Sequence, residues 1–372
     1  MISVLFLQTR MGVGGAESVW KRLLKELDRQ RFQPVLCCLY DRGEIGEELQ
    51  TSGIPVYSNL AKNRWDPAVF PRLVQILRSH RIDILYTLDQ PLTQFWGMLA
   101  ALWNRKVLFV TSSHSTGSIN RAGRRRWLNL VSARIARRVV ALSRTHGTYL
   151  EKNGIPASKI EIISNGVCLK KFAGENNAVD RAEFGIGPED PVVGLVAMLR
   201  PEKAIEIFLD AAGRVLEKFP GVEFLIAGDG PEREKLERLA REKKITDRVR
   251  FLGLRPDIPR VVSLFDVAVL CSSPVVETLS MAALEYMAAG KPVVATRVGS
   301  LPELIGEGRE GYLVEPGDSA GMAARIVQLI ADPRRAREMG RRGQQRVAEF
   351  YTADTMVKKT EMLFERLMRK GS

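Results

Sequence analysis

Cysteine is scarce in this sequence. The 372 residues include only four cysteines, Cys37, Cys38, Cys168 and Cys271, and no two of them form a Cys-x-x-Cys pair. Disulfide-stapled folds and structural zinc sites need cysteines in recurring, closely spaced patterns. The sequence therefore indicates neither, and it fits a reducing compartment, so we expect a cytoplasmic protein.

Long apolar runs are missing as well. The longest mostly apolar stretch, residues 91–103, is shorter than the roughly 20 residues that a helix needs to cross a bilayer. The first ten residues, MISVLFLQTR, have no basic segment ahead of the apolar ones, which favours a buried strand over a signal peptide. Glycine (31 residues) and proline (18) are too few for a fibrous chain, and 45% hydrophobic residues exclude a disordered one. We expect a globular protein, soluble or peripheral.

Acidic residues are fewer than basic ones. Lys and Arg number 56 against 43 Asp and Glu, which gives a net charge of +13. Such an excess favours polyanions, anionic lipid surfaces or phosphorylated small molecules as partners, and composition does not choose among them.

Short runs rich in Val, Ile and Leu alternate with amphipathic stretches of helical period. This alternation predicts βαβ units and an α/β fold with parallel sheets. The expected strands are residues 2–7, 34–39, 82–88, 107–111 and 139–142, and, after a restart of the pattern, 191–199, 222–227, 249–252, 267–270 and 292–295. The expected helices are 16–28, 67–79, 123–136, 205–218, 232–243, 279–289 and 319–331.

The restart predicts two Rossmann-like, doubly wound domains. We expect an amino-terminal domain over residues 1–170, a Gly- and Pro-broken linker over 171–190, and a second domain over 191–350. A last helix within 351–372 has no strand after it and is expected to pack back toward the first domain. In doubly wound folds the ligand lies at the carboxyl ends of the strands, here in the crevice between the two halves.

A glycine-rich turn follows the first expected strand. In Met11-Gly-Val-Gly-Gly-Ala-Glu17, Gly14 and Gly15 would let backbone amides approach an anion at the start of a helix. The motif is not the dinucleotide fingerprint, because Glu17 stands where the third glycine belongs. A tight strand-to-helix turn without a ligand explains it equally well.

Two cations follow the first strand of the second half. Arg200 and Lys203, in Arg200-Pro-Glu-Lys203, stand where a strand ends and a helix starts, so they would reach the crevice edge. A Lys and an Arg at that place can neutralise a diphosphate without a metal. The alternative is that water solvates both side chains at the surface.

Two glutamates follow the strand at 267–270. Glu277 lies in a loop and Glu285 in an apolar helix; eight residues of helix would span about 12 Å, similar to the span from the sugar to the ribose of a nucleotide sugar. The free amides of Leu279, Ser280 and Met281 would face the phosphates between them. A carboxylate buried alone is costly, so Glu285 needs a polar partner. Ribose hydroxyls would serve, and so would a Lys or Arg that the sequence does not reveal.

These motifs together resemble a known family, the retaining glycosyltransferases of family 4 (glycosyl transferases group 1), which have the two-domain GT-B fold. The resemblance covers nearly the whole chain. It rests on the following motifs in this order: Gly14-Gly15-Ala16-Glu17, Ser164-Asn165-Gly166-Val167, Ala227-Gly228-Asp229-Gly230-Pro231, Phe251-Leu252-Gly253, Glu277 through Glu285 (the family's Glu-x7-Glu), Gly290 through Thr296, Val298-Gly299, Pro302-Glu303-Leu304 and Gly311 through Val314.

The resemblance implies roles for individual residues. It implies that Glu277 contacts the donor sugar, Glu285 the ribose, and Lys203 the diphosphate. His114, in Ser112-Ser-His-Ser-Thr116, matches a family histidine of the first domain that faces sugar and phosphate, whereas a lone histidine is otherwise more often structural. The resemblance also implies retention at the anomeric carbon and no required metal or cofactor, and no Asp-x-Asp triplet argues otherwise.

The sequence departs from the family's pattern at several positions. Met198 replaces an arginine five residues before the lysine, for which Arg200 would compensate, and Ala204 replaces the glycine after the lysine. Thr278 replaces a frequent glycine, and Ser164 replaces a proline. These changes bear on donor affinity and sugar preference more than on the reaction class.

A basic segment accounts for part of the charge. Arg124, Arg125 and Arg126 are followed by Trp127 in a stretch where further arginines alternate with apolar residues. Such a segment can lie on an anionic bilayer, on the inner face of the cytoplasmic membrane, as a lipid-linked acceptor would require. Alternatively, Leu128, Val131 and Ile135 face the core and the arginines form a solvated face.

The leading hypothesis is a hexosyltransferase that moves a sugar from an NDP-sugar, with UDP as the expected nucleotide, to a cell-surface glycan or lipid-linked precursor. A sugar-nucleotide epimerase of the same fold is the first alternative. A basic nucleic-acid-binding protein is the second, although no stacking-aromatic motif accompanies the charge, and we expect no nucleic acid partner.

Overall fold

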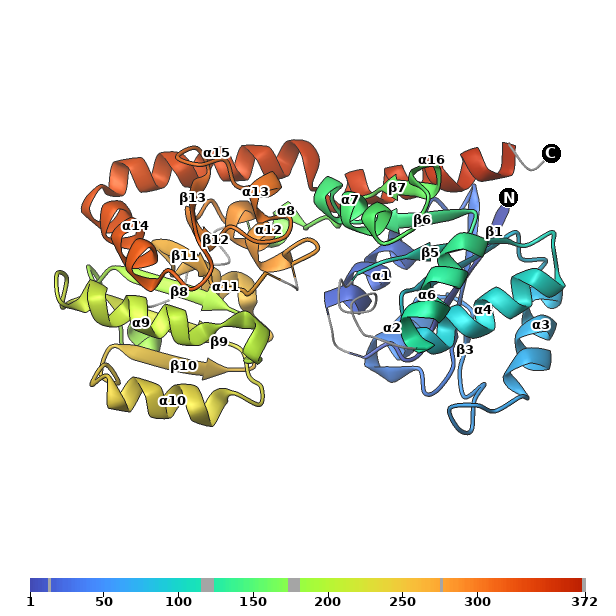
Figure 1. Cartoon of the computed structure of the whole chain (residues 1–372), viewed down its shortest axis with the longest axis horizontal. Helices are drawn as coiled ribbons and strands as arrows, with labels where there is room; N and C mark the ends of the chain where they lie inside the picture. The colour runs from blue at the N-terminus through green and yellow to red at the C-terminus, as the bar shows by residue number, and fades with distance from the viewer. Residues whose placement is uncertain (13–14, 115–123, 173–180, 275–276, 370–372) are drawn as a thin grey trace. The chain divides into compact units, whose positions relative to one another are not determined.

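The chain folds into two units, each built on its own β-sheet (Figure 1). The computed structural model describes residues 1–12, 15–114, 124–172, 181–274 and 277–369. Unit 1 consists of Met1–Gly166 and Ala353–Ser372, and unit 2 of Val167–Thr352. In Figure 1 the red helix α16 accordingly lies with the blue and green elements. The α/β class with two doubly wound halves, predicted from the alternation of strands and helices, is confirmed.

The sheet of unit 1 has seven parallel strands in the order β3-β2-β1-β4-β5-β6-β7. Its strands are β1 (Ile2–Gln8), β2 (Phe32–Cys38), β3 (Val56–Tyr57), β4 (Ile84–Leu88), β5 (Leu108–Ser112), β6 (Arg138–Ala141) and β7 (Ile160–Ile162). The central strands are almost entirely buried, because helices cover both faces of a parallel sheet. The strand order reverses between β1 and β4.

The helices of unit 1 include one from the far end of the chain. They are α1 (Gly15–Glu26), α2 (Gly43–Thr51), α3 (Val69–Ser79), α4 (Pro91–Trp103), α6 (Arg124–Ile135), α7 (Arg144–Lys152), α16 (Ala353–Arg369) and the 3₁₀ helix η1 (Ala157–Lys159). Helix α16 packs against α1. Its Phe364 is fully buried, with ring centroids 5.7 Å from Tyr86 and 6.1 Å from Phe32. Helix α16 thereby completes the core of unit 1.

The sheet of unit 2 has six parallel strands in the order β10-β9-β8-β11-β12-β13. They are β8 (Val192–Val196), β9 (Glu223–Ala227), β10 (Val249–Gly253), β11 (Val267–Leu270), β12 (Val293–Thr296) and β13 (Gly311–Val314). The order reverses between β8 and β11. Loops diverge there at the carboxyl ends of the strands, which is the place where doubly wound folds bind ligands.

The helices of unit 2 cover both faces of this sheet. They are α8 (Leu169–Phe172), α9 (Ile205–Leu216), α10 (Arg233–Glu242), α11 (Ile258–Ser263), α12 (Met281–Ala288), α13 (Leu301–Leu304), α14 (Ser319–Ala331), α15 (Pro333–Phe350) and the 3₁₀ helices η3 (Arg181–Phe184) and η4 (Pro201–Lys203). Helix α15 packs closely on α12 and the turn after it. A Cβ atom on Gly340 would come within 1.8 Å of the carbonyl oxygen of Gly290.

The structure divides the chain after Gly166, whereas we expected the boundary at residue 170. Within the expected linker, residues 181–190 belong to unit 2, and 173–180 lie outside the described residues. The chain leaves and re-enters unit 2 at one place, because the Val167 amide donates to the Tyr351 carbonyl oxygen at 2.9 Å. No helix in the described parts of the chain is both long and apolar enough to cross a membrane.

Candidate functional site

The carboxyl ends of β8 and β11 bring together two segments that sequence analysis selected separately. After β8 the chain forms η4, which carries Lys203, and after β11 it continues through Cys271 and Ser272 toward Glu277. The Cys271 thiol donates to the Lys203 carbonyl oxygen at 3.2 Å, and the Ser273 amide donates to that of Glu202 at 2.9 Å. These bonds fix the two segments side by side.

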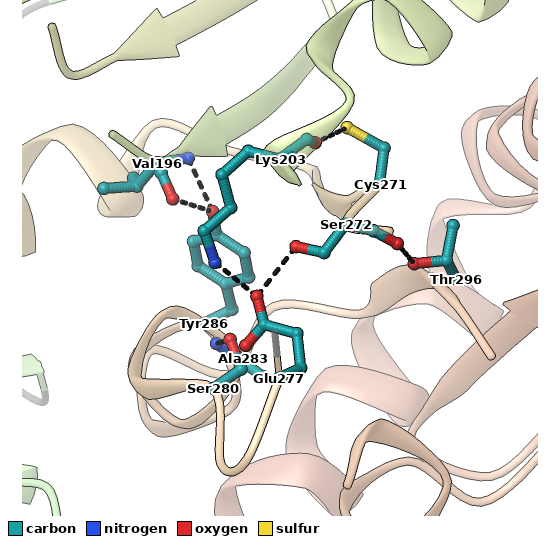
Figure 2. Close-up of polar contacts among 9 residues, drawn as sticks. All are labelled: Val196, Lys203, Cys271, Ser272, Glu277, Ser280, Ala283, Tyr286 and Thr296. Atoms are coloured by element: carbon teal, nitrogen blue, oxygen red, sulfur yellow. Dashed lines mark hydrogen bonds and ion pairs between the residues drawn. The ribbon is translucent and has the colours of Figure 1, made fainter. Parts of the chain in front are cut away.

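Lys203, Glu277 and Ser272 form a polar cluster at this edge (Figure 2). The Lys203 ammonium forms an ion pair with Glu277 Oε1, and the Ser272 hydroxyl donates to the same oxygen at 2.7 Å. The Glu277 side chain is 5% exposed and that of Lys203 is 24% exposed. A carboxylate at such depth is costly unless it is paired and hydrogen-bonded, and here it is both. Ser272 was not among the predicted site residues.

The backbone around Glu277 is held just as closely. Ser300 donates its amide to the Glu277 carbonyl oxygen at 3.1 Å, and Thr296 donates its hydroxyl to that of Ser272 at 2.8 Å. Gly299 has a φ of +52°, and a Cβ atom there would lie 1.8 Å from the Glu277 carbonyl oxygen. Only glycine satisfies both conditions. The Val298-Gly299 motif therefore shapes the site without contributing a side chain to it.

Helix α12 is anchored to β8 beside this cluster. Val196 donates its amide to the Tyr286 hydroxyl oxygen at 2.6 Å, and the hydroxyl group lies 3.4 Å from the Val196 carbonyl oxygen (Figure 2). Burial raises the pKa of Tyr286 well above its usual range. Ser280 caps the helix by accepting from the Ala283 amide at 3.3 Å. Met281 is the first residue of α12, Ser280 is the cap residue and Leu279 precedes it, whereas we expected the helix to begin at residue 279.

Glu285 lies on α12, four residues after the first residue of the helix. The residues between the two glutamates are not one continuous helix, because α12 begins only at Met281. The expected span of about 12 Å assumed eight residues of helix between them, so that expectation is wrong. Burial raises the pKa of Glu285 to about 7, against the opposing effect of Lys171. Lys171, on α8, is the cation that the sequence did not reveal. It favours the ionised form too weakly to offset the burial.

The remaining donor-side positions have different surroundings. Arg200 and Met198 are both exposed, on the segment between β8 and η4. Ala204, directly after Lys203, adopts a left-handed conformation with φ +48°. This conformation explains why the resembled family has glycine there, since an L-residue pays a steric penalty for it. Gly228 is required for a similar reason, as a Cβ atom there would lie 1.8 Å from the Ala197 carbonyl oxygen.

His114 lies in unit 1, after the carboxyl end of β5. Its Nε2 is 2.9 Å from the Ser112 hydroxyl oxygen. Burial, together with the nearby His146, lowers the pKa of His114 to about 3, so the ring is neutral at physiological pH. The neighbouring Ser113 hydroxyl bonds Asp89 Oδ2 at 3.2 Å and approaches His146 Nε2 at 3.4 Å.

Asp89, Ser113 and His146 escaped the sequence analysis. They follow β4, β5 and β6, three adjacent strands whose carboxyl ends meet at one edge of the sheet. Asp89 and Ser113 directly follow apolar runs, which is a signal that could have found them, whereas His146 lies five residues after β6, in the first turn of α7. His146 accepts from the Leu142 amide through Nδ1 at 3.3 Å, which leaves the proton on Nε2.

Other predicted residues of unit 1 are only partly described. Gly15 is the first residue of α1, and Gly14 lies outside the described residues. Arg124, Arg125 and Arg126 begin α6, but their side chains lie outside the described part. Trp127 is 66% exposed. Leu128 and Val131 pack on the core, as the alternative interpretation of this segment required, whereas Ile135 is 36% exposed.

Within the described residues, no group of three or more His, Cys, Asp or Glu side chains is arranged to hold a metal ion. All four cysteines are free, and burial raises the pKa of Cys38 and Cys271 to about 12. Thiolate chemistry is therefore not favoured at either position.

Two family models match the chain, one in each half. The model for glycosyl transferases group 1 matches residues 176–346, and that for Glycosyltransferase Family 4 matches residues 13–171. Together they cover most of the sequence.

Relatives and solved structures agree with these models. The chain is 25% identical to the N-acetyl-alpha-D-glucosaminyl L-malate synthase of Bacillus anthracis, over 88% of this chain and 91% of that protein. It is 28% identical to a GDP-mannose-dependent alpha-(1-6)-phosphatidylinositol monomannoside mannosyltransferase of Mycolicibacterium smegmatis, over 75% of each. It spans about half the length of the D-inositol 3-phosphate glycosyltransferases that it also matches. A structure of Anabaena HepE in complex with UDP superposes with a TM-score of 0.86 at 24% identity, covering 98% of this chain and 100% of that one.

Proposed function

This chain belongs to the group 1 glycosyltransferases with the GT-B fold, and on that premise we propose that it moves a hexose from a UDP-sugar to a cell-surface glycan or a lipid-linked acceptor. We further propose that the configuration at the anomeric carbon is retained and that no metal ion is required. The observation that carries the proposal is the cluster of Lys203, Glu277 and Ser272 beside the start of α12.

We assign the diphosphate to Lys203, Arg200 and the amides of Leu279, Ser280 and Met281. The Lys203 ammonium has three N–H donors, and Glu277 uses one, so others can reach phosphate oxygens. The start of α12 adds the positive end of a helix dipole. Preorganised donors of this kind stabilise charge that develops on a leaving group, which is what a metal ion would otherwise do.

We assign the donor sugar to Glu277 and His114, and the ribose to Glu285. Lys203 and Ser272 both reach Oε1 of Glu277, so a sugar hydroxyl would bond to Oε2. In the reaction, the bond between the anomeric carbon and the diphosphate oxygen breaks, and a bond to the acceptor oxygen forms. The acceptor's proton passes to the departing diphosphate. His114, with its pKa of about 3, is neutral and would take part as a hydrogen-bonding group.

The names of similar proteins support the substrate classes. The HepE structure holds UDP, and the Mycolicibacterium smegmatis relative is named for GDP-mannose and a phosphatidylinositol mannoside. A lipid-linked acceptor would place this protein at the inner face of the cytoplasmic membrane, where the segment from Arg124 to Trp127 would contact the bilayer. Membership of a glycosyltransferase family favours transfer over the epimerase alternative.

The donor is tested with a panel of UDP-, GDP- and ADP-sugars, with EDTA and with Mg²⁺. We expect one UDP-sugar to raise the unfolding temperature and to be hydrolysed slowly, equally well in EDTA. NMR of the released or transferred sugar reports the anomeric configuration. Activity that vanishes in EDTA, or an inverted product, would contradict the corresponding part of the proposal.

The site is tested with three variants. Lys203→Met and Glu285→Ala each remove bonds that involve a charged group, so we expect the Kd for the UDP-sugar to rise about 10–100-fold. Glu277→Gln should mainly lower kcat. Lys235→Met serves as a matched control, because Lys235 pairs with Glu232 on the exposed face of α10. Unchanged affinity in both Lys203→Met and Glu285→Ala would refute the site assignment.

A further inference from the structure

Nearly all of the net charge of this protein lies in one stretch of unit 1. Residues 51–150 contain fifteen Lys and Arg residues but only three Asp and no Glu, a net charge of +12 out of +13 for the whole chain. The other residues are almost neutral in sum. The cationic character is therefore a property of one part of unit 1, and it needs a local explanation.

The three acidic side chains of this stretch accept hydrogen bonds from other residues of the protein. Asp66 accepts from the amides of Lys62 and Ala68 at 2.9 and 3.0 Å, and Asp83 accepts from the Ser3 amide at 2.8 Å. Asp89 accepts from Ser113. By contrast, the side chains of Lys62, Arg64, Arg78, Arg81, Arg105 and Lys106 are exposed. A partner that approaches this surface meets cations with little acidic compensation.

Exposed large hydrophobic residues lie in the same stretch as these cations. Trp65 is 59% exposed, Trp103 49% and Leu102 50%, and the first two stand before α3 and at the end of α4. Between α3 and α4, which pack together in unit 1 (Figure 1), lies an open groove of about 580 Å³. Phe70, Val74, Arg78 and Trp103 line it. We call these residues, with Trp65 and Arg64, the α3–α4 surface.

Trp65 and Trp103 each lie beside an arginine. The guanidinium of Arg78 lies 4.5 Å from the ring centroid of Trp103, and that of Arg64 lies 5.6 Å from Trp65. Tryptophan with an adjacent cation is favoured at the boundary between acyl chains and head groups, because the ring is amphipathic and the cation meets lipid phosphates.

From the charge, the groove and these stacked pairs we infer that the α3–α4 surface docks on an anionic phospholipid bilayer. The rings of Trp65 and Trp103 enter the head-group boundary, and Arg64 and Arg78 bind lipid phosphates. A bilayer fits better than a protein partner because the cations extend beyond the groove to Arg105 and Lys106, as a continuous anionic plane requires. The inference rests on the proposed function in one respect, because a lipid-linked acceptor gives the protein a reason to bind a membrane. Vesicle binding itself requires neither the donor nor the acceptor sugar.

The test is co-sedimentation of the full chain with phosphatidylcholine vesicles, with and without phosphatidylglycerol. We expect binding only to the anionic vesicles, and weaker binding at higher ionic strength. Arg64→Gln with Arg78→Gln should weaken the partition about fivefold for each arginine. Trp65→Ala with Trp103→Ala should also lower it. The control is Phe350→Ala with Arg341→Gln in unit 2, which removes a 48% exposed aromatic ring and an exposed arginine elsewhere.

A second readout is tryptophan fluorescence, which can be measured first in the unmodified protein. Brominated phospholipids should quench tryptophan fluorescence. In a Trp127→Phe background, which removes the other exposed tryptophan, Trp65→Phe with Trp103→Phe should remove most of the quenching, since Trp20 and Trp96 are buried. Equal binding to zwitterionic vesicles, or vesicle binding unchanged in both α3–α4 variants, would overturn the inference. The inference would also be overturned if the protein formed a dimer that is lost in these variants, since a second copy would then cover the surface. A salt-sensitive shift of DNA without vesicle binding would overturn it as well.

Slow hydrolysis of the donor in the absence of vesicles separates this inference from the proposed function. We expect hydrolysis to be unchanged in the α3–α4 variants. If the unmodified protein does not hydrolyse the donor, that result counts against the proposed function. The vesicle binding then still tests the membrane inference separately.

Discussion

At the scale of single residues, the site depends on pairs that are distant in the sequence. Lys203 and Glu277 are 74 residues apart, yet they meet because β8 and β11 are neighbours in the sheet. Both residues were predicted from their positions after strands, but nothing in the sequence indicates that they are partners. Ser272, which bonds to the same carboxylate oxygen, was missed because a serine after a strand is common and its partner depends on the fold.

The pKa of Glu285 predicts a pH dependence of donor binding. With a value of about 7, the carboxyl group is about half ionised at neutral pH. Ribose hydroxyls donate to the ionised form, so affinity should fall as the pH falls below about 7, approaching tenfold per pH unit. Affinity should level off above that pH.

This dependence can be measured by calorimetry with a UDP-sugar, whose diphosphate does not titrate in this range. Glu285→Gln should bind more weakly and independently of pH between about 6 and 8. His114 does not interfere, since its pKa of about 3 lies below the window. An unmodified protein with a flat profile would show that Glu285 does not accept from the ribose.

Ala204 predicts a stability gain. An alanine at φ +48° is strained by about 1–2 kcal/mol, whereas glycine costs about 0.5–1 kcal/mol in unfolded-state entropy. Ala204→Gly should therefore raise the free energy of unfolding by roughly 0.5–1 kcal/mol in urea titrations. Ala211→Gly, in the interior of α9, is the control and should lose stability. Equal losses in both would mean that the left-handed conformation carries no strain.

At the scale of elements, the strands were more predictable than the helices. All ten expected strands are present, because a strand buried on both faces leaves a continuous apolar run. The three missed strands are short. They are β3, β7 and β13, with two, three and four residues, and tertiary context decides whether such segments pair. Helix α15 was missed since two glycines in its interior, Gly340 and Gly343, lower its helical propensity. In the structure, Gly340 permits the close approach of this helix to Gly290.

At the scale of the whole molecule, the two-domain plan followed from the restart of the strand pattern. We expected the last helix to pack back toward the first domain, but the sequence did not reveal which core residues it covers, because any amphipathic helix would fit that expectation. In the structure, the ring of Phe364 packs edge-on against Tyr86 and Phe6, with centroids 5.7 and 6.5 Å away. Unit 1 therefore depends on a residue that follows all of unit 2 in the sequence.

This dependence predicts that the two units can be destabilised separately. Phe364→Ala removes a buried ring and should cost unit 1 about 3–5 kcal/mol. Phe208→Ala, which removes a buried ring beside Phe224 in unit 2, is the matched variant. Hydrogen exchange followed by mass spectrometry should show faster exchange in β1 and β4 for the first variant, and in β8 and β9 for the second. Equal acceleration of both sheets by either variant would mean that the units unfold together.

The two-segment composition of unit 1 has a consequence for biosynthesis. A ribosome that has completed residue 166 still has to make all of unit 2 before α16 exists. At about 5–20 residues per second, that interval lasts roughly 10–40 s. During it, Phe6, Phe32 and Tyr86 lack the ring that covers them, while unit 2 has all of its own strands as soon as β13 emerges. The later unit in the sequence can thus finish folding before the earlier one, and chaperones that bind exposed aromatic residues would meet the nascent chain at the face of unit 1 that α16 later covers.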